Sequence, residues 1–421
     1  MKEDVLPEGW EKTKLGKYLY LKNGYAFKKT DYVEKSKHSY PIIRISDINN
    51  FTATDKNAIH TNYIAKGFEL EKNDLLIAMS GATTGKLGVY KGNVPAYQNQ
   101  RVGNLKLIGK GDSQFRNYLM LSLQELIEKL AYGGAQPNIS GKIIEDIDIN
   151  LPPLPEQQYL SQKLTALLDE VVQTKQRLEA IPALLKQFRQ SVLTDAVSGR
   201  LTDSDKYKDH KLKDYFDFID GDRGPNYPKK DEYSDKGYCL FLSTKNVREF
   251  GFDFSECIYI SQEKDSVLRK GKLNRGDVII TTRGTLGNVA SYDEKVAFDN
   301  MRINSGMLIL RKKENNILNE YSKILIASPL FKQMITDKQT GSAQPQLPAG
   351  ILKEFEVPIP SIEEQTQIVQ KVETYFALAD EIETQVKAAL ENVNLLTQSI
   401  LAKAFNGELS AEWRTQQAAK N

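Results

Sequence analysis

The sequence predicts a mixed α/β protein built as an internal repeat, in which two globular α/β domains alternate with two similar long helices. Two observations support this prediction. Residues 135–157 and 343–365 resemble each other, and Gln157 aligns with Gln365 at an offset of 208 positions. Each repeated segment leads into a long stretch with apolar residues three or four positions apart, which is typical of a helix.

The offset of 208 continues downstream, where Gly199 aligns with Gly407. A fainter similarity joins residues 74–81 to 277–284 at an offset of 203, and residues 96–101 to 297–302 at an offset of 201. Because the offset drifts, we expect the two domains to share a fold and to differ in their loops. The glycine loop at Gly284 is one residue shorter than the loop at Gly81, which leaves the equivalence of these two loops open.

The two repeated helices are predicted to pack on each other. Each opens after prolines, and the glycines at 199 and 407 supply C-terminal stops. A helix of about 40 residues spans about 60 Å, too long to bury its apolar side in one small domain. We therefore expect the two helices to pack on each other as a coiled coil, and Pro182 should kink or interrupt the first helix. The predicted apolar seam consists of Leu160, Leu164, Leu167, Val171, Leu178, Ile181, Leu185, Phe188 and Val192 in the first helix, and of Ile368, Val372, Tyr375, Ala379, Ile382, Val386, Ala389, Val393, Leu396 and Ile400 in the second.

We divide the chain into a first domain over 1–150, a central helix over 151–200, a second domain over 201–357, and a C-terminal helix with its tail over 358–421. Both domains contain short strand patterns separated by Gly, Asn and Asp turns, and one amphipathic helix each, near 116–131 and 317–335. The strand patterns cover residues 40–45, 74–78, 104–108, 277–281 and 306–310.

Composition narrows the function classes. The net charge is only +2, with the positive excess in residues 1–150 and an acidic excess in residues 358–421. DNA binding would therefore depend on local patches or on partners that share phosphate neutralisation. Cys239 and Cys257 do not form a CxxC pair and are expected to be free thiols in a cytoplasmic protein. The three scattered histidines predict no metal site, and no apolar window predicts a signal peptide or membrane span.

Several motifs together resemble the specificity subunits of type I restriction-modification enzymes. They are Leu6-Pro-Glu-Gly-Trp10, the loop from Asp74 to Gly85, Gln98-Asn-Gln-Arg101, Leu151-Pro-Pro-Leu-Pro-Glu-Gln157 and Leu193-Thr-Asp-Ala-Val-Ser-Gly-Arg-Leu201. The resemblance covers essentially the whole chain, and the order of domain, helix, domain, helix agrees with it.

The resemblance implies a non-catalytic subunit whose two target-recognition domains each read one half of a bipartite DNA site. It also implies that the two long helices form an antiparallel coiled coil with a pseudo-two-fold axis. The domains have diverged, so the two half-sites should differ and the site should not be a palindrome. The implied partners are double-stranded DNA, two methyltransferase subunits that methylate adenine at N6, and restriction-translocase subunits. No cofactor is expected on this chain, because S-adenosylmethionine would bind to the methyltransferase partners.

Candidate DNA contacts follow from the side chains that can read base edges or neutralise phosphates. Gln and Asn can bond adenine bidentately, and Arg can do the same to guanine. The alternatives are a solvated turn for the polar residues and plain solvation for the lysines. The candidates are Lys28, Arg44, Ser80, Lys86, Gln98, Gln100, Arg101, Lys245, Arg283, Asn300 and Arg302. Gln136 and Gln344 occur in both halves, which favours a backbone contact or a shared structural role.

Two other functions remain open at this point. One is a coiled-coil scaffold that never binds DNA, and the other is a self-sufficient DNA-modifying enzyme. The second is weakly supported: Leu151-Pro-Pro-Leu154 lacks the polar and aromatic ends of an adenine methyltransferase motif, and Gly81-Ala-Thr-Thr-Gly85 is one residue too short for a phosphate loop.

Overall fold

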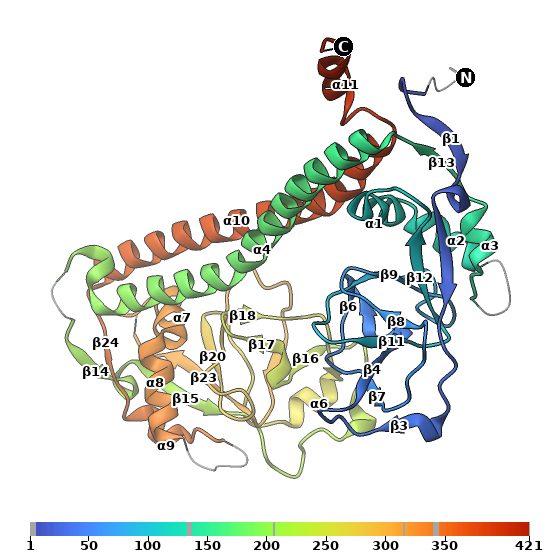
Figure 1. Ribbon diagram of the computed structural model, residues 1–421. Helices are drawn as coiled ribbons and strands as arrows, with labels where there is room; N and C mark the ends of the chain where they lie inside the picture. Colours follow the sequence, from blue (N-terminus) through green and yellow to red (C-terminus); the bar gives the residue numbers. More distant parts are fainter. Residues whose placement is uncertain (1–5, 133–136, 205–206, 315, 340–344, 421) are drawn as a thin grey trace. The chain divides into compact units, whose positions relative to one another are not determined.

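The computed structural model describes residues 6–132, 137–204, 207–314, 316–339 and 345–420 (Figure 1). The chain forms two compact units. Unit 1 comprises Met1–Glu179 and Ala388–Asn421, and unit 2 comprises Ala180–Lys387. The division passes through both long helices, so each unit contains one part of each helix.

Unit 1 is built on a six-stranded sheet with the order β2-β12-β9-β10-β6-β5 and a five-stranded sheet with the order β3-β7-β4-β11-β8. The strand β1 pairs antiparallel with β13 outside these sheets. The bounds are β1 Glu11–Lys14, β2 Leu19–Asn23, β3 Tyr32–Val33, β4 Tyr40–Ile43, β5 Ile48–Asn49, β6 Phe51–Ala53, β7 Ile59–Thr61, β8 Glu69–Leu70, β9 Leu75–Ala78, β10 Leu87–Tyr90, β11 Ala96–Gln98, β12 Val102–Leu107 and β13 Asp148–Leu151. The helices are α1 Ser113–Ser122, α2 Gln124–Ala131, α3 Gly141–Glu145 and α11 Ala411–Ala418.

Unit 2 repeats this plan with fewer strands. Its main sheet has the order β15-β23-β20-β21, its second sheet the order β19-β16-β22, and β14 pairs with β24. The bounds are β14 Asp209–Lys211, β15 Phe216–Asp220, β16 Cys239–Leu242, β17 Val247–Arg248, β18 Gly251–Phe252, β19 Tyr259–Ile260, β20 Asp277–Thr281, β21 Val289–Tyr292, β22 Met301–Ile303, β23 Met307–Lys312 and β24 Glu356–Pro358. The helices are α5 Leu212–Tyr215, α6 Gln262–Val267, α7 Asn319–Ala327, α8 Pro329–Lys338 and α9 Ala349–Lys353.

The predicted elements appear at the predicted places, which confirms the mixed α/β repeat. Each expected amphipathic helix is in fact a pair of short helices, α1 with α2 and α7 with α8. One helix of each pair has a side-chain cap at its start: the Asp112 side chain accepts from Phe115 N at α1, and the Ser328 side chain accepts from Phe331 N at α8. These helices bury their apolar sides with the main sheet in the core of their own unit.

The long helices α4 (Leu154–Ser198) and α10 (Ile362–Phe405) pack as an antiparallel coiled coil. In unit 1, Lys175 Nζ donates to Asn394 Oδ1 at 3.0 Å, and in unit 2, Arg189 Nη2 donates to Asp380 Oδ1 at 2.5 Å. Most of the predicted seam is buried or half-buried. The exceptions are Phe188, Tyr375 and Leu396, which are exposed.

The ends of these helices follow the sequence prediction, and the first helix is not interrupted at Pro182. Gly199 and Gly407 have φ values of 85° and 86°, a left-handed conformation in which a side chain is strained. Both therefore terminate their helices as expected. Of the two outcomes predicted for Pro182, a kink or an interruption, the interruption is wrong, because α4 is one helix from Leu154 to Ser198 with Pro182 inside it.

A buried glutamine ties each long helix to the sheet domain of the same unit. Gln157 Nε2 donates to Pro152 O at 2.9 Å, and its Oε1 accepts from Asp112 N at 3.1 Å, just before α1. Gln365 Nε2 donates to Pro360 O at 2.9 Å, and its Oε1 accepts from Leu318 N at 2.8 Å, just before α7. The repeated glutamine therefore satisfies backbone groups that would otherwise be buried without partners.

Candidate nucleic-acid interface

Three segments meet at the same place in each unit. In unit 1 they are the turn after β9, the turn before β12 and the strand-like segment at Asn138, which forms a bridge with Ser80. In unit 2 the corresponding bridge joins Arg283 to Gln346. Asn138 and Gln346 are 208 positions apart, as the sequence repeat requires, and Ser80 and Arg283 are 203 apart. The two places are therefore structurally equivalent.

The strand register corrects one of the sequence alignments. Asn99 N donates to Ile43 O at 3.0 Å, and Asn304 N donates to Leu242 O at 3.0 Å, so these two asparagines occupy the same position. Two residues later, Arg101 O accepts from Met79 N at 2.9 Å, where Gly306 O accepts from Thr282 N at 2.8 Å. The offset here is 205 and not 201.

Consequently Arg101 corresponds to Gly306, and Arg302 does not correspond to Arg101. Register places Gln98 beside Ile43 and Ile303 beside Leu242, so Arg302 takes the place of Tyr97 in a buried strand. The sequence similarity of residues 96–101 to 297–302 therefore does not reflect structural equivalence.

Arg302 is only 3% exposed and lies in a buried ion pair. Its Nε donates to Asp265 Oδ1 at 2.8 Å, and its Nη1 donates to Lys270 O at 2.6 Å. Burial raises the pKa of the Asp265 carboxyl, but hydrogen bonds from Lys272 and Arg302 outweigh burial and lower the pKa overall. Arg302 therefore stabilises the protein interior, and its guanidinium is not available to contact DNA.

The Gln98 side chain is not available to contact DNA either, because it is 0% exposed. Its Nε2 donates to Lys22 O at 2.8 Å, which joins β11 to β2 within unit 1. An amide held there cannot reach a base edge without the sheet opening.

The meeting point in unit 1 surrounds a hollow of about 940 Å³. Arg101 and Tyr132 are exposed at it. The hydroxyl Oγ of Ser80 is buried, and no described residue forms a hydrogen bond with it. An unsatisfied buried hydroxyl is uncommon, and a ligand entering the hollow could satisfy it. The lining residues are Ser80, Gly81, Ala82, Arg101, Tyr132, Pro137 and Asn138.

The equivalent hollow in unit 2 measures about 250 Å³ and has a different lining. Arg283 is exposed there, on the turn where unit 1 has Ser80. An adjoining hollow of about 320 Å³ shares Asp220 and Arg223 with it and adds Arg269 and Lys270. The first hollow is lined by Asp220, Arg223, Thr282, Arg283, Leu308, Gln346, Leu347, Pro348 and Ala349.

The remaining candidates fall into two groups. Lys28, Lys86, Gln100 and Lys245 are exposed and free to meet a ligand, although Lys245 Nζ lies 3.9 Å from Glu256. The other two, Arg44 and Asn300, are half-buried and make contacts within the protein, so they are less suited to contact DNA.

Arg44 is half-buried, and its Nε donates to Asp47 Oδ2 at 3.4 Å. Asn300 is half-buried, and its carbonyl accepts from Leu240 N at 2.9 Å. Gln136 and Gln344 lie outside the described residues. Sequence reasoning missed Tyr132, Asn138, Arg223 and Gln346, although the offset shared by Asn138 and Gln346 could have pointed to two of them.

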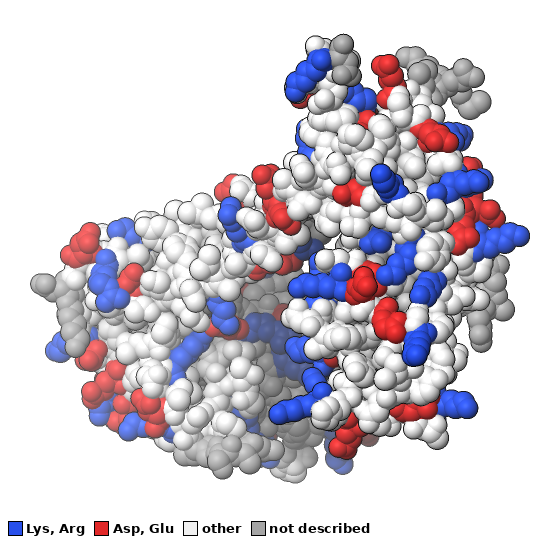
Figure 2. Space-filling model, viewed as in Figure 1, with Lys and Arg blue, Asp and Glu red and all other residues white. Residues whose placement is uncertain are grey.

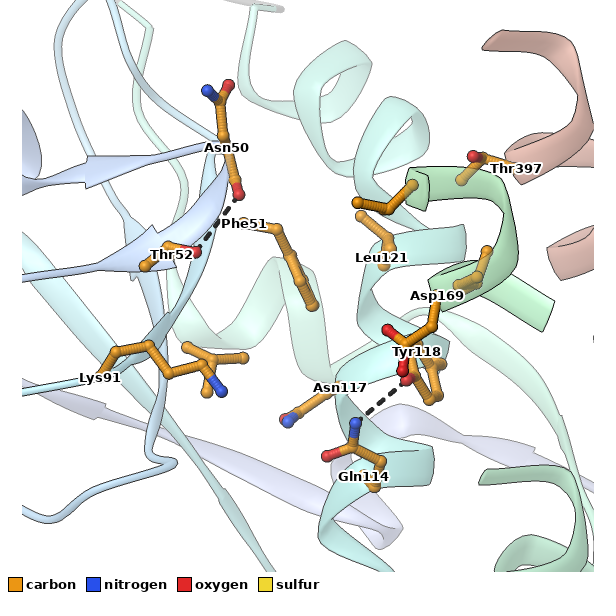
Figure 3. Close-up of a pocket in the computed structure, with 13 residues that line it drawn as sticks. Asn50, Phe51, Thr52, Lys91, Gln114, Asn117, Tyr118, Leu121, Asp169 and Thr397 are labelled. Atoms are coloured by element: carbon orange, nitrogen blue, oxygen red, sulfur yellow. Dashed lines mark hydrogen bonds between the residues drawn. The ribbon is translucent and has the colours of Figure 1, made fainter. Parts of the chain in front are cut away.

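A second kind of hollow lies between the sheet domain and the long helices of unit 1 (Figure 3). It measures about 410 Å³, with Phe51 and Lys91 on the sheet side and Tyr118 on α1. Asp169 on α4 and Thr397 on α10 complete it. Unit 2 has a counterpart of about 320 Å³, lined by Phe250, Lys295, Glu320, Lys323, Ile324, Val369, Val372, Glu373, Phe376, Ala377 and Asp380.

Charge is interspersed on both units. On the face shown in Figure 2, lysine and arginine side chains lie among aspartate and glutamate side chains over much of the surface. This agrees with the net charge of +2. Binding through local cationic groups fits this surface better than binding through a general positive field.

Comparison with known proteins gives a consistent result. The model of the type I restriction modification DNA specificity domain matches residues 7–183 and 204–392. The chain is 33% identical to the EcoKI specificity subunit of Escherichia coli strain K12, over 99% of this chain and 92% of that protein. It is 30% identical to the EcoBI specificity subunit of Escherichia coli, over 97% of this chain and 88% of that protein.

Solved structures share the fold. The HsdS subunit from Thermoanaerobacter tengcongensis superposes with a TM-score of 0.64 at 17% identity, over 96% of this chain and 98% of that one. A chain from a type I R-M system superposes with a TM-score of 0.69 at 17% identity, over 96% and 99%. Within the described part of this chain, no helix is long and apolar enough to cross a membrane. With a family match over both halves and relatives of 30% identity or more over nearly its whole length, the chain belongs to the type I restriction-modification DNA specificity subunits, the subunits that carry specificity and not catalysis.

Proposed function

We propose that this specificity subunit recognises a bipartite, asymmetric site in double-stranded DNA, with one half-site bound by each unit. The observation that carries the proposal is the pair of equivalent hollows, at the bridge of Ser80 with Asn138 and at the bridge of Arg283 with Gln346. Their backbones match, and their side chains differ. A protein whose two similar units bind two different DNA sequences needs a shared backbone and different side chains at its two binding sites.

The side chains around the hollows can make the required contacts. Arg donates two hydrogen bonds to the O6 and N7 atoms of guanine, and Asn or Gln bonds adenine in the same bidentate way. Unit 1 offers Arg101, Gln100 and Asn138 at or beside its hollow, and unit 2 offers Arg283 and Gln346. Exposed lysines such as Lys28 and Lys245 are suited to phosphate, which positions the protein without reading sequence.

We further propose that the repeated helices bind two methyltransferase subunits, which carry S-adenosylmethionine and methylate adenine at N6, and that restriction subunits complete the complex in the cytoplasm. Exposed apolar side chains on the helices support such partners: Val172, Leu395 and Leu396 in unit 1, and Leu184, Phe188, Tyr375 and Leu378 in unit 2. Apolar side chains in such number on a helix pair favour a protein partner.

The test is to map methylated adenines in cells that express the methyltransferase with and without this chain. The proposal expects one bipartite motif with two different halves, present only when the chain is expressed. Replacing residues 201–357 with the equivalent block of a relative should change one half and keep the other. A scaffold that never binds DNA would produce no motif, and a change in both halves would mean that the units do not read independently.

A further inference from the structure

We infer that Arg101 and Arg283 are the principal specificity-determining arginines of this chain, each reading a guanine in the half-site of its own unit. The inference rests on the proposed function and deepens it. The sequence does not pair these two residues, because the similarity at residues 96–101 aligns Arg101 with Arg302 and not with Arg283. The strand register places them on neighbouring turns of the same kind of hollow.

In unit 1 the arginine is on the turn before β12, and the neighbouring turn after β9 carries Ser80. In unit 2 the arrangement is reversed: the turn before β23 carries Gly306, and the turn after β20 carries Arg283. The two turns are joined by the bond from Met79 N to Arg101 O at 2.9 Å and by its equivalent from Thr282 N to Gly306 O at 2.8 Å. A guanidinium can therefore reach the same hollow from either turn.

The electrostatic setting of these two arginines differs from that of most others in the chain. Among the described residues, neither guanidinium has a carboxylate within ion-pair distance. Most other arginines do: Arg44, Arg189, Arg200, Arg223, Arg248, Arg275, Arg302, Arg311 and Arg414 each lie within 4.0 Å of Asp or Glu. An exposed arginine without an internal partner keeps all five donors for a ligand.

The backbone around each arginine holds it in place before a ligand arrives. Arg101 N donates to Asn99 Oδ1 at 3.4 Å, which closes the turn. Arg283 N donates to Gly306 O at 3.2 Å, and the bridge to Gln346 fixes its other side. A side chain on a fixed backbone loses less entropy when it binds, and a planar fork then selects guanine over the other bases.

The hollow in unit 1 also holds a polar group to which no described residue forms a hydrogen bond. The Ser80 hydroxyl in unit 1 is buried with no hydrogen bond from any described residue, beside Arg101. A nucleotide in the hollow could accept a hydrogen bond from this hydroxyl or donate one to it, while Arg101 donates hydrogen bonds to the base edge. In unit 2 the larger Arg283 stands in place of Ser80, so the two units should prefer guanine at different positions of their half-sites.

The experiment uses the full chain with its methyltransferase partner and maps methylated sites for the variants R101A and R283A. Each variant should relax one base pair in one half-site, with discrimination for guanine lowered about 10- to 100-fold. The other half-site should stay unchanged and serves as an internal control. R101K and R283K keep the charge but lose the planar fork, so they should relax the same base pair.

The matched control is R248A, because Arg248 is an exposed arginine of unit 2 whose Nη2 lies 2.7 Å from Asp253 Oδ2. It should leave the motif unchanged. A uniform loss of affinity over all sequences, with a shallower salt dependence, would overturn the inference and make these arginines phosphate contacts. An unchanged motif would also overturn it. In both cases wild-type chain would still give a bipartite motif, whereas failure of the proposed function would give none.

Discussion

Replacing Arg302 with alanine tests whether the buried ion pair, and not DNA contact, explains this residue. The substitution removes three hydrogen bonds: from Nε to Asp265 Oδ1 at 2.8 Å, from Nη2 to Asp265 O at 2.9 Å and from Nη1 to Lys270 O at 2.6 Å. The Asp265 carboxylate, which is 5% exposed, then loses its buried partner.

Breaking a buried ion pair on one side costs about 3–5 kcal/mol. The lower end applies here, because Lys272 Nζ remains 2.5 Å from Asp265 Oδ2 and is itself partly exposed. For a unit of this size, about 3 kcal/mol lowers the unfolding midpoint by about 6–12 °C. Thermal unfolding of the full chain, followed by circular dichroism, measures this shift.

The pH dependence follows from the lowered pKa of Asp265. A carboxyl whose pKa is lower in the folded state stabilises the fold above its unfolded pKa of about 3.9, and this contribution is lost as the pH falls through the folded value. The stability difference between wild type and R302A should therefore hold from pH 7 down to about 4 and shrink as the pH falls below that value.

R101A is the control, since Arg101 is exposed and should leave the unfolding midpoint unchanged. The methylation map should give the opposite result for the two variants. R302A should preserve both half-sites when the protein is folded, whereas R101A should relax one of them. An R302A protein of wild-type stability that fails to read one half-site would refute this reasoning and would indicate that Arg302 contacts DNA.

Two further predictions concern the scaffold and the thiols. Q157A and Q365A should each lower the free energy of unfolding by about 1–3 kcal/mol, because each leaves buried backbone groups without a partner, and denaturant titration should show similar costs for both. Cys239 should resist alkylation while Cys257 reacts, because burial raises the pKa of the Cys239 thiol to about 12 and Cys257 is only half-buried; peptide mass spectrometry after timed alkylation of the native protein gives the order, and equal rates would contradict it.

The sequence was sufficient to predict the architecture because the architecture depends on repeated patterns. The constant offset of 208 between Gln157 and Gln365 identified the repeat, and the apolar spacing identified the helices. The two free cysteines were also predicted. The interruption expected at Pro182 does not occur, because the surrounding helix keeps its other backbone bonds and one missing N–H does not end it.

The site was harder to predict because register cannot be read from short matches. Tyr97 and Arg302 occupy the same place in a strand although they share no chemistry, while Arg101 takes the place of a glycine. Sequence similarity at residues 96–101 therefore selected the wrong partner. Backbone hydrogen bonds fix the register, and only their pattern shows which side chains face the hollow.

Internal contacts of the main sheets recur in the two units, whereas the side chains at the hollows differ. This contrast indicates that one set of residues stabilises the fold and another determines specificity. The kept residues bind backbone or each other inside a unit: Asp74 accepts from Lys106 Nζ at 2.6 Å on the main sheet of unit 1, and Asp277 accepts from Arg311 Nη2 at 2.7 Å at the same place in unit 2. These contacts stabilise one fold in both halves, so a change in either partner would be destabilising in either unit. Arg101 and Arg283 at the hollows have no carboxylate within ion-pair distance among the described residues, so each of these two can change with little cost to the fold. Specificity can therefore diverge in each half while the scaffold that positions both halves stays the same.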